Sequence, residues 1–179
     1  MMRIYGFYRI ALIAGVLLAS LGVCAIFAQN SPPPFELTIS IVNRMGDVSD
    51  RRIFKVGDDI GIRIDLASVS DHAFLLTSSS PDCDYYVVVL KADGEPAPDT
   101  ERGHEVRQML RKNESCYGRH GAGILQPYAK APGGDLISVN KLNDLSRPGE
   151  YTIQVERRFP RDFGAGIVKS NIINVTVTE

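Results

Sequence analysis

The sequence predicts an all-β domain built from two antiparallel sheets, a β-sandwich, with an irregular loop or short helix inserted between strands. Short segments alternate apolar and polar residues, and turn-forming residues separate these segments at intervals of about 10 residues. Helical spacing of apolar residues is almost absent. No segment of 20–50 residues repeats, so the sequence does not predict a repeat array.

Residues 1–28 have the pattern of a secretory signal peptide. Arg3 and Arg9 precede residues 10–28, which carry no charge and end in small residues. An uncleaved N-terminal membrane anchor is the alternative, because this apolar stretch approaches the length that spans a bilayer. Residues 29–34 form a proline-rich spacer that cannot start a helix. Both readings place the single domain, residues 35–179, in an extracytoplasmic location, periplasmic or secreted.

The charge of the exported part argues against nucleic-acid binding. Residues 1–28 hold two of the 20 Lys and Arg residues and none of the 21 Asp and Glu residues, so residues 29–179 carry a net charge of −3. A nucleic-acid-binding domain is usually strongly basic. We therefore expect a protein or a cell-envelope component as the partner, and contact with the membrane only through an uncleaved N-terminal segment.

Alternation predicts the strands, because successive side chains of a strand point to opposite faces of the sheet. The predicted strands cover residues 35–41, 60–66, 74–76, 85–90, 136–142, 152–159 and 173–177. The alternation is most regular over residues 60–66, so we expect this strand in the middle of a sheet. Residues 85–90 are apolar at nearly every position, which is typical of a strand covered on both sides, and Asp93-Gly94 ends it in a turn.

Residues 95–135, called the insert below, are predicted to be irregular because prolines and clustered glycines interrupt them. Within the insert, Val106, Met109 and Leu110 follow helical spacing. A short helix over residues 105–112 therefore competes with an edge strand, and we favour a loop or a helix.

The most specific element is the turn from Leu145 to Tyr151, in which Pro148 and Gly149 lead a tyrosine into the strand that follows. Tyr151 shares the parity of Ile153 and Val155, as an inward-facing ring requires. These residues resemble the tyrosine corner of immunoglobulin-like and fibronectin type III-like domains, in which the tyrosine hydroxyl bonds to the upstream backbone. The resemblance implies an immunoglobulin-like two-sheet β-sandwich.

The exported region also resembles small exported bacterial immunoglobulin-like proteins. These end in a similar Asp-Leu-Ser-x-Pro-Gly-x-Tyr-Thr-Ile-Gln-Val element followed by a Val-Lys-Ser-Asn strand, here Val168 to Asn171. The chain has no Trp, and its cysteines do not occupy the usual inter-sheet positions, which excludes an antibody-type domain. The resemblance implies a fold and no particular activity.

Cys83 and Cys116 are the two cysteines of the exported part, and in an oxidising compartment a disulfide between them is the expected state. The alternative is a metal site formed by Cys83, His104, Cys116 and His120, which have suitable donor atoms but no compact metal-binding spacing. Titration of free thiols with and without reductant separates the two hypotheses.

The chain has no Gly-x-Ser-x-Gly nucleophile motif and no phosphate-binding loop, so we predict no catalytic residue, no cofactor and no enzyme activity. Positive charge gathers at Arg102, Arg107, Arg111, Lys112 and Arg119, and again at Arg157, Arg158 and Arg161. Either cluster can face acidic glycans, phospholipid headgroups or an acidic partner.

The leading hypothesis is an exported, non-enzymatic immunoglobulin-like binding module that presents the insert as its recognition surface. A periplasmic metal-binding protein is the first alternative, and a proteinase inhibitor is the second.

Overall fold

The computed structural model describes residues 34–112, 121–159 and 166–179. These belong to the compact unit Pro33–Glu179. The predicted signal peptide and nearly all of the spacer therefore lie outside the described residues. Within the described ranges, no helix is both long and apolar enough to span a membrane.

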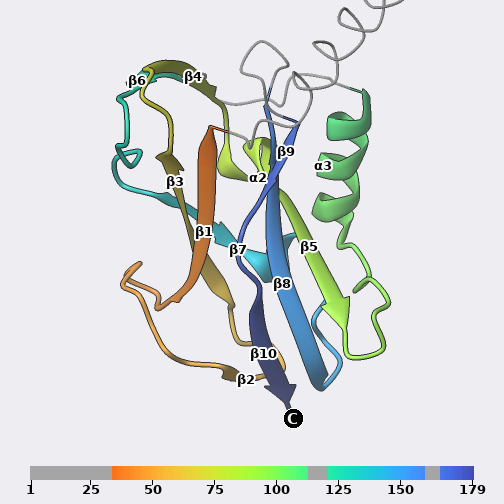
Figure 1. Ribbon diagram of the computed structural model, residues 1–179. Coiled ribbons are helices and arrows are strands. Elements are labelled where there is room, and N and C mark those ends of the chain that lie inside the picture. Colours follow the sequence, from red (N-terminus) through yellow and green to blue (C-terminus); the bar gives the residue numbers. More distant parts are fainter. Residues whose placement is uncertain (1–33, 113–120, 160–165) are drawn as a thin grey trace, which may run out of the picture. The chain divides into compact units, whose positions relative to one another are not determined.

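The domain is mostly β, and its strands form two main sheets that lie side by side in Figure 1. The first sheet has the order β1-β3-β7 and consists of β1 (Phe35–Val42), β3 (Gly61–Ser68) and β7 (Asp135–Ser138). The second has the order β2-β10-β8-β5 and consists of β2 (Ile53–Lys55), β10 (Ile173–Thr178), β8 (Gly149–Arg158) and β5 (Tyr86–Lys91), with β9 (Ile167–Lys169) paired to β8. The prediction that residues 60–66 form a middle strand is confirmed, because β3 lies between β1 and β7.

The prediction of two wholly antiparallel sheets is wrong in two respects. β2 pairs with β10 in parallel. Parallel strands need a long connection in place of a tight hairpin, and most of the domain's sequence lies between these two strands. In addition, β4 (Phe74–Ser78) and β6 (Gly121–Leu125) pair with each other in a third, two-stranded sheet.

The core lies between the two main sheets and consists of the inward-facing residues of the alternating strands. Ile62 and Ile64 of β3 and Ile153 and Val155 of β8 are almost completely buried. The rings of Phe35 in β1 and Phe159 after β8 stack with their centroids 4.2 Å apart, which joins the layers at one end. The alternation in the sequence thus translates directly into burial.

The insert is more regular than predicted. It contains α3 (Glu101–Lys112), β6 and the start of β7, so the description of residues 95–135 as mainly irregular is wrong for most of their described part. The expected helix is present and begins one turn before residue 105. Thr100 explains the earlier start, because its hydroxyl accepts a hydrogen bond from the Gly103 amide at 3.0 Å and so satisfies a free N–H of the first turn.

The strand predicted over residues 136–142 is shorter than expected. β7 ends at Ser138, and the 3₁₀ helix η2 (Val139–Lys141) follows. The side-chain oxygen of Asn140 accepts a hydrogen bond from the Ile60 amide at 2.8 Å, and Leu142 donates to the carbonyl of Val139 at 3.0 Å. These bonds turn the chain away from the sheet before it can continue as a strand.

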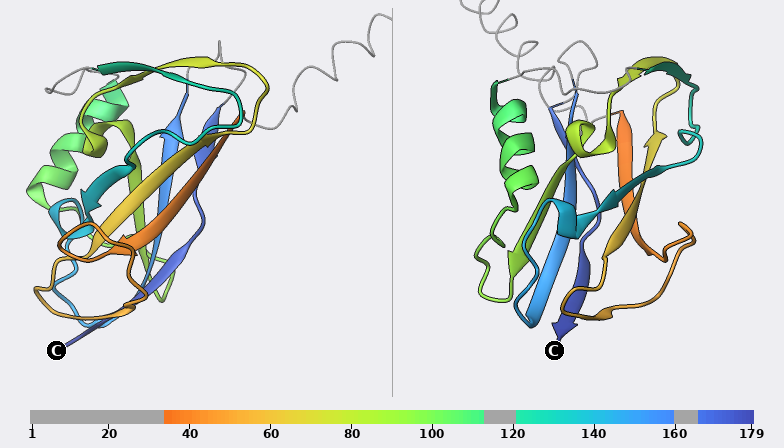
Figure 2. Two further views of the ribbon diagram at one scale, coloured as in Figure 1. Left: turned by 90° about the vertical axis from the view of Figure 1, so that its left-hand side faces the viewer. Right: turned by 180° about the vertical axis from the view of Figure 1, so that it is seen from behind.

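α3 closes one open side of the two-sheet core. It lies beside β5, on the side of that strand away from β1 and β3 (Figure 2). Its Gly103 lies directly against the backbone of Leu142, which follows β7, and Val106 is buried. Arg107 pairs with Asp99 at 2.5 Å and lies over the ring of Tyr86 in β5. The helix therefore bridges the edges of both sheets.

The other open side is closed by the connection between β9 and β10. The Ile39 amide of β1 donates to the side-chain oxygen of Asn171 at 2.7 Å, and the Asn171 side-chain nitrogen donates to the Ile39 carbonyl at 3.2 Å. Beside it, the Ser170 hydroxyl accepts a hydrogen bond from the Val155 amide of β8 at 2.9 Å. Two adjacent side chains thus tie the edge of the first sheet to the second.

The turn before β8 places Leu145 and Tyr151 in the core and leaves Pro148 and Gly149 exposed. The hydroxyl of Tyr151 donates to the carbonyl of Arg147 at 2.7 Å, which is the contact expected from the resemblance to a tyrosine corner. This bond connects the turn to the core of the domain.

Replacing Tyr151 by Phe removes this hydrogen bond and keeps the ring. We expect the free energy of unfolding to fall by about 1 kcal/mol, the usual net value of one such bond. Urea unfolding measures the change, and Tyr128→Phe is the control because Tyr128 is 72% exposed. Equal stability losses in the two variants would show that the hydrogen bond does not hold the corner.

Candidate functional site

A groove with a volume of about 890 Å³ opens where β8 runs past the start of β5. The last turn of α3 forms one wall, and β4 and α2 (Pro81–Asp84) contribute to the rest. Its lining combines arginines with apolar side chains, and we call it the arginine groove. Its volume is within the range of about 300–1,000 Å³ that is typical of small-molecule sites.

Arg157 of β8 is the most unusual residue of the groove. It occupies an inward-facing position, two residues after Val155, and is only 8% exposed. Its guanidinium donates to the Tyr85 hydroxyl at 3.1 Å and to the Thr77 carbonyl at 3.1 Å. It also lies over the rings of Tyr85 and Phe159. Within the described part of the chain no carboxylate forms an ion pair with it.

Tyr85 connects Arg157 to Asp135. The Tyr85 hydroxyl donates to the Asp135 carboxylate at 2.8 Å while it accepts the hydrogen bond from Arg157. Burial raises the pKa of Tyr85 well above its usual value, so the phenol stays protonated at physiological pH. The described hydrogen bonds link Asp135 to Arg157 through this neutral hydroxyl, without a direct ion pair between the two charges.

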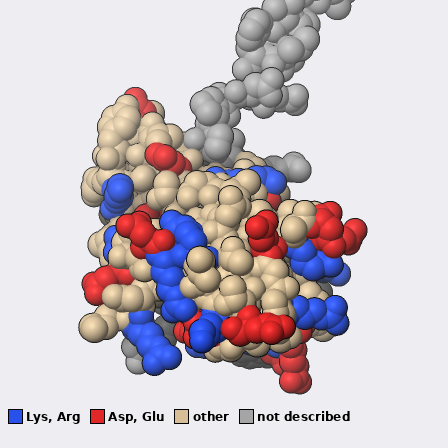
Figure 3. All heavy atoms as spheres, turned by 90° about the horizontal axis from the view of Figure 1, so that it is seen from below, with Lys and Arg blue, Asp and Glu red and all other residues tan. Residues whose placement is uncertain are grey.

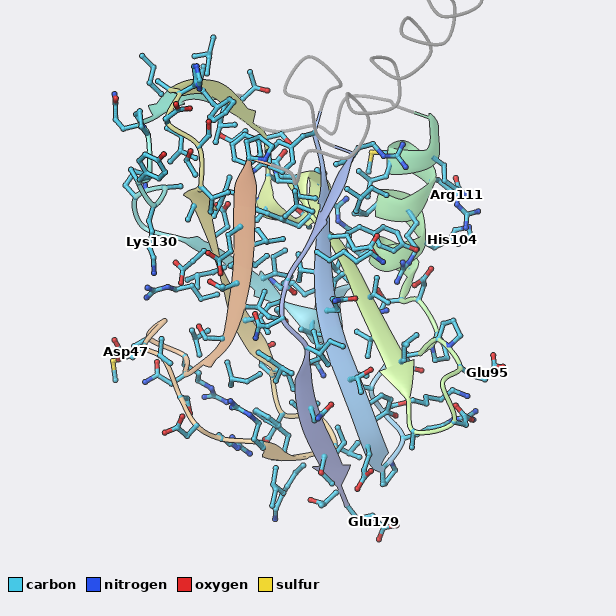
Figure 4. The ribbon with its side chains drawn as sticks, viewed as in Figure 1. Asp47, Glu95, His104, Arg111, Lys130 and Glu179 are labelled. Carbon is cyan, nitrogen blue, oxygen red and sulfur yellow. The ribbon has the colours of Figure 1, made fainter. Side chains whose placement is uncertain are left out.

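Three further arginines line the arginine groove: Arg107 and Arg111 of α3, and Arg158 of β8. Arg107 is engaged by Asp99. Arg111 and Arg158 are exposed, and neither forms an ion pair with another described residue. Figure 4 shows Arg111 on α3. Figure 3 shows the domain from below the view of Figure 1, and on that face acidic and basic side chains lie side by side.

The two acidic residues of the groove already have partners. The carboxylate of Asp84 accepts hydrogen bonds from the backbone amide and the hydroxyl of Ser79, the latter at 2.8 Å. Glu156 pairs with Lys169 at 2.7 Å. Neither carboxylate forms an ion pair with Arg111, Arg157 or Arg158 among the described residues, and the four arginines of the lining outnumber its two acids.

The groove joins the two positive clusters of the sequence, which are separated by about 45 residues. Sequence reasoning treated them as two alternative surfaces and missed that Arg107 and Arg111 share one groove with Arg157 and Arg158. One signal was available. Arg157 has the same parity as Tyr151, Ile153 and Val155, so the alternation already placed a charge at a core position.

The proposed ligands of a metal site are not all covered by the structure. Cys83 is buried in α2 and lines the groove, whereas Cys116 and His120 lie outside the described residues. His104 is exposed on α3 (Figure 4). Its Nε2 lies 2.7 Å from the side-chain nitrogen Nε2 of Gln108. In the described ranges no three His, Cys, Asp or Glu side chains are grouped to hold a metal. The disulfide between Cys83 and Cys116 stays a prediction.

The adjacent acids at Asp58 and Asp59 belong to a turn. The Lys55 amide donates to the Asp58 carboxylate at 3.0 Å, and Arg51 pairs with the same carboxylate. The Lys55 hydrogen bond and the contact with Arg51 lower the pKa of Asp58, so this carboxylate is charged at neutral pH. These contacts stabilise the turn before β3.

No protein-family model matches this chain, and no curated protein matches it. Among solved structures, the chain is similar to a β-glucosidase from Listeria innocua in complex with glucose, with 10% sequence identity and a TM-score of 0.40. The match covers 84% of this chain and 17% of that enzyme, so this chain spans less than a fifth of the enzyme's length. A likeness at this level carries no argument about function.

Proposed function

We propose that residues 35–179 form an immunoglobulin-like β-sandwich that acts outside the cytoplasm as a binding module and that the arginine groove is its ligand site. The observation that carries the proposal is the convergence of Arg111, Arg157 and Arg158, from two distant parts of the chain, on one groove. A concave site with mainly apolar walls and a few charged groups is the usual form of a ligand pocket.

Three features support the immunoglobulin-like assignment and the location. The two main sheets enclose a shared core, and the Tyr151 hydroxyl bonds to the Arg147 backbone. The N-terminal pattern of residues 1–28 predicts export. Loops and helices at the end of a rigid pair of sheets are common positions for binding residues.

The chemistry of the groove favours binding over catalysis. Its described lining holds four guanidinium groups, which keep a fixed positive charge at physiological pH, against the two carboxylates of Asp84 and Glu156, and most of the remaining side chains are apolar. Such a lining attracts and orients an anion, whereas hydrolysis normally needs a nucleophile hydrogen-bonded to a base. The metal-binding and proteinase-inhibitor hypotheses stay predictions, since no described contact favours either.

Filling the groove is expected to abolish binding. Leu110 of α3 lines the groove, and Leu110→Trp places a large ring in it. The exported protein, wild type or variant, is immobilised and exposed to an extract of its native cell envelope, and the retained proteins and lipids are quantified by mass spectrometry. We expect the components retained by the wild type to be lost with Leu110→Trp.

Val48→Trp is the matched control, because Val48 is 60% exposed and does not line the groove. It should retain the same components as the wild type. Circular dichroism and thermal unfolding establish that both variants are folded. Retention of the same components by Leu110→Trp, or of none by the wild type, would contradict the proposal.

A further inference from the structure

We propose that the arginine groove recognises a small amphipathic anion, a carboxylate or phosphate monoester attached to an apolar chain. This inference rests on the proposed function, because it specifies the ligand class of the same groove. A buried cation, two exposed cations and apolar walls define this ligand class.

Arg157 supplies the buried cation. A guanidinium has five N–H groups, and the contacts of Arg157 with Tyr85 and Thr77 use two of them. Both acceptors are uncharged, and a buried charge is costly unless an opposite charge accompanies it. Arg157 lines the groove, so an anion bound there can reach its remaining donors. The bound anion would complete a site that the described residues leave positively charged.

Arg111 and Arg158 supply the exposed cations at the same groove. The planar guanidinium fork matches the two oxygens of a carboxylate or phosphate, and such paired hydrogen bonds are among the stronger ones in proteins. Among the described residues, neither Asp84 nor Glu156 forms an ion pair with these arginines: Asp84 accepts hydrogen bonds from Ser79, and Glu156 pairs with Lys169. The groove therefore presents, from α3 and β8, two guanidinium groups that no described residue pairs with, together with the buried one.

The apolar walls define the rest of the ligand. Leu75, Leu76, Leu110, Phe159 and Ile167 all line the groove. Leu75 is 61% exposed and Ile167 is 47% exposed, so apolar area remains accessible beside the charges. Covering this area stabilises a complex by about 25 cal/mol for each Å² removed from water. A purely ionic ligand would leave this contribution unused.

Octyl phosphate is the probe for this ligand class, and isothermal titration calorimetry of the full exported protein measures its binding. We expect saturable binding of octyl phosphate, weaker binding of inorganic phosphate, and no binding of the uncharged octyl glucoside. Raising the salt concentration should weaken the binding of octyl phosphate, because ions screen exposed charges over about 10 Å at 0.1 M. Equal affinity for octyl glucoside would overturn the proposal.

Charge reversal at the groove locates the binding. Arg111→Glu and Arg158→Glu should each weaken octyl phosphate binding about ten-fold or more, as expected when a charge-assisted hydrogen bond is replaced by repulsion. Both residues are exposed, so the variants should fold. Arg44→Glu is the matched control, since Arg44 is exposed outside the groove and should leave the affinity unchanged. A similar loss in all three variants would overturn the proposal.

Vesicles distinguish the source of the anion. Binding of free octyl phosphate assigns a soluble ligand. Retention on vesicles that contain phosphatidic acid, a phosphate monoester, but not on phosphatidylcholine vesicles, lost in Arg158→Glu, assigns a lipid headgroup. Either result supports the proposal, and absence of both overturns it. If Leu110→Trp still abolishes envelope binding while neither probe binds, the ligand class is wrong and the binding function stands. If Leu110→Trp has no effect, the proposed function fails as well.

Discussion

Replacement of Gly103 by Ala is expected to lower the free energy of unfolding by about 3 kcal/mol, the largest effect among these substitutions. A Cβ atom at this position would overlap the carbonyl oxygen of Leu142 and lie 2.8 Å from its carbonyl carbon. Both atoms belong to the backbone, so no change of side-chain rotamer relieves the clash. The higher helix propensity of Ala returns only about 1 kcal/mol.

The clash concerns the contact that holds α3 against the segment after β7. The Thr100 amide donates to the Leu142 carbonyl at 3.1 Å, and the Thr100 hydroxyl donates to the Lys141 carbonyl at 2.5 Å. Moving the helix away would strain these bonds and expose Val106. Because Leu110 and Arg111 lie two turns further along α3, the same displacement should also weaken ligand binding in the arginine groove.

Urea unfolding followed by circular dichroism measures the loss. The control is Gly123→Ala in β6, where an added Cβ meets no atom within 4 Å. Gly123→Ala should change the free energy of unfolding by no more than about 0.5 kcal/mol. Equal unfolding midpoints for Gly103→Ala and the wild type would mean that α3 does not pack against Leu142.

Replacement of Asn171 by Ala is the second large effect, and we expect a loss of about 2 kcal/mol. The Asn171 side chain makes two hydrogen bonds to Ile39, at 2.7 and 3.2 Å, and each is worth about 1 kcal/mol. Without them the amide and the carbonyl of Ile39 lose their hydrogen-bond partner at the edge of the first sheet. Water can reach this edge, which limits the loss to the net value of the bonds.

Ile172→Ala is the adjacent control, because Ile172 is 60% exposed. Its stability should stay within about 0.5 kcal/mol of the wild type. Hydrogen exchange adds a local measurement: the Ile39 amide should exchange faster in Asn171→Ala and at the wild-type rate in Ile172→Ala. Unchanged exchange at Ile39 would show that the Asn171 side chain does not protect the β1 edge.

The helix α3 and the connection between β9 and β10, which close the two open sides of the core, show where sequence reasoning was sufficient and where it was not. Val106, Met109 and Leu110 predicted the helix, because helical spacing is a local property. The first turn of α3 was missed, because Gly103 lowers helix propensity. The Thr100 hydroxyl that caps this turn and the close contact of Gly103 with the Leu142 backbone become visible only in the structure. Asn171 belongs to the Val168 to Asn171 segment on which the resemblance to exported immunoglobulin-like proteins partly rests. Its bonds to Ile39 join residues 132 positions apart, so the sequence did not reveal them.

The candidate site was predictable only in parts. Sequence reasoning identified both positive clusters and the burial parity of β8, yet it treated the clusters as separate surfaces. It also proposed the insert as the recognition surface, and among the described residues of the insert only those of α3 line the arginine groove. The other described lining residues come from β4, α2, β5, β8 and β9, whose proximity follows from strand pairing and sheet packing.

The alternation of apolar and polar residues was enough to determine the β character, the position of β3 and the inward faces of β1, β8 and β10. Alternation works because the two faces of a strand recur every second residue, so a short segment carries the information. Tertiary structure alone decided the parallel pairing of β2, the docking of α3 and the meeting of Arg111, Arg157 and Arg158. Those features depend on contacts between residues far apart in the chain, and no local period encodes them.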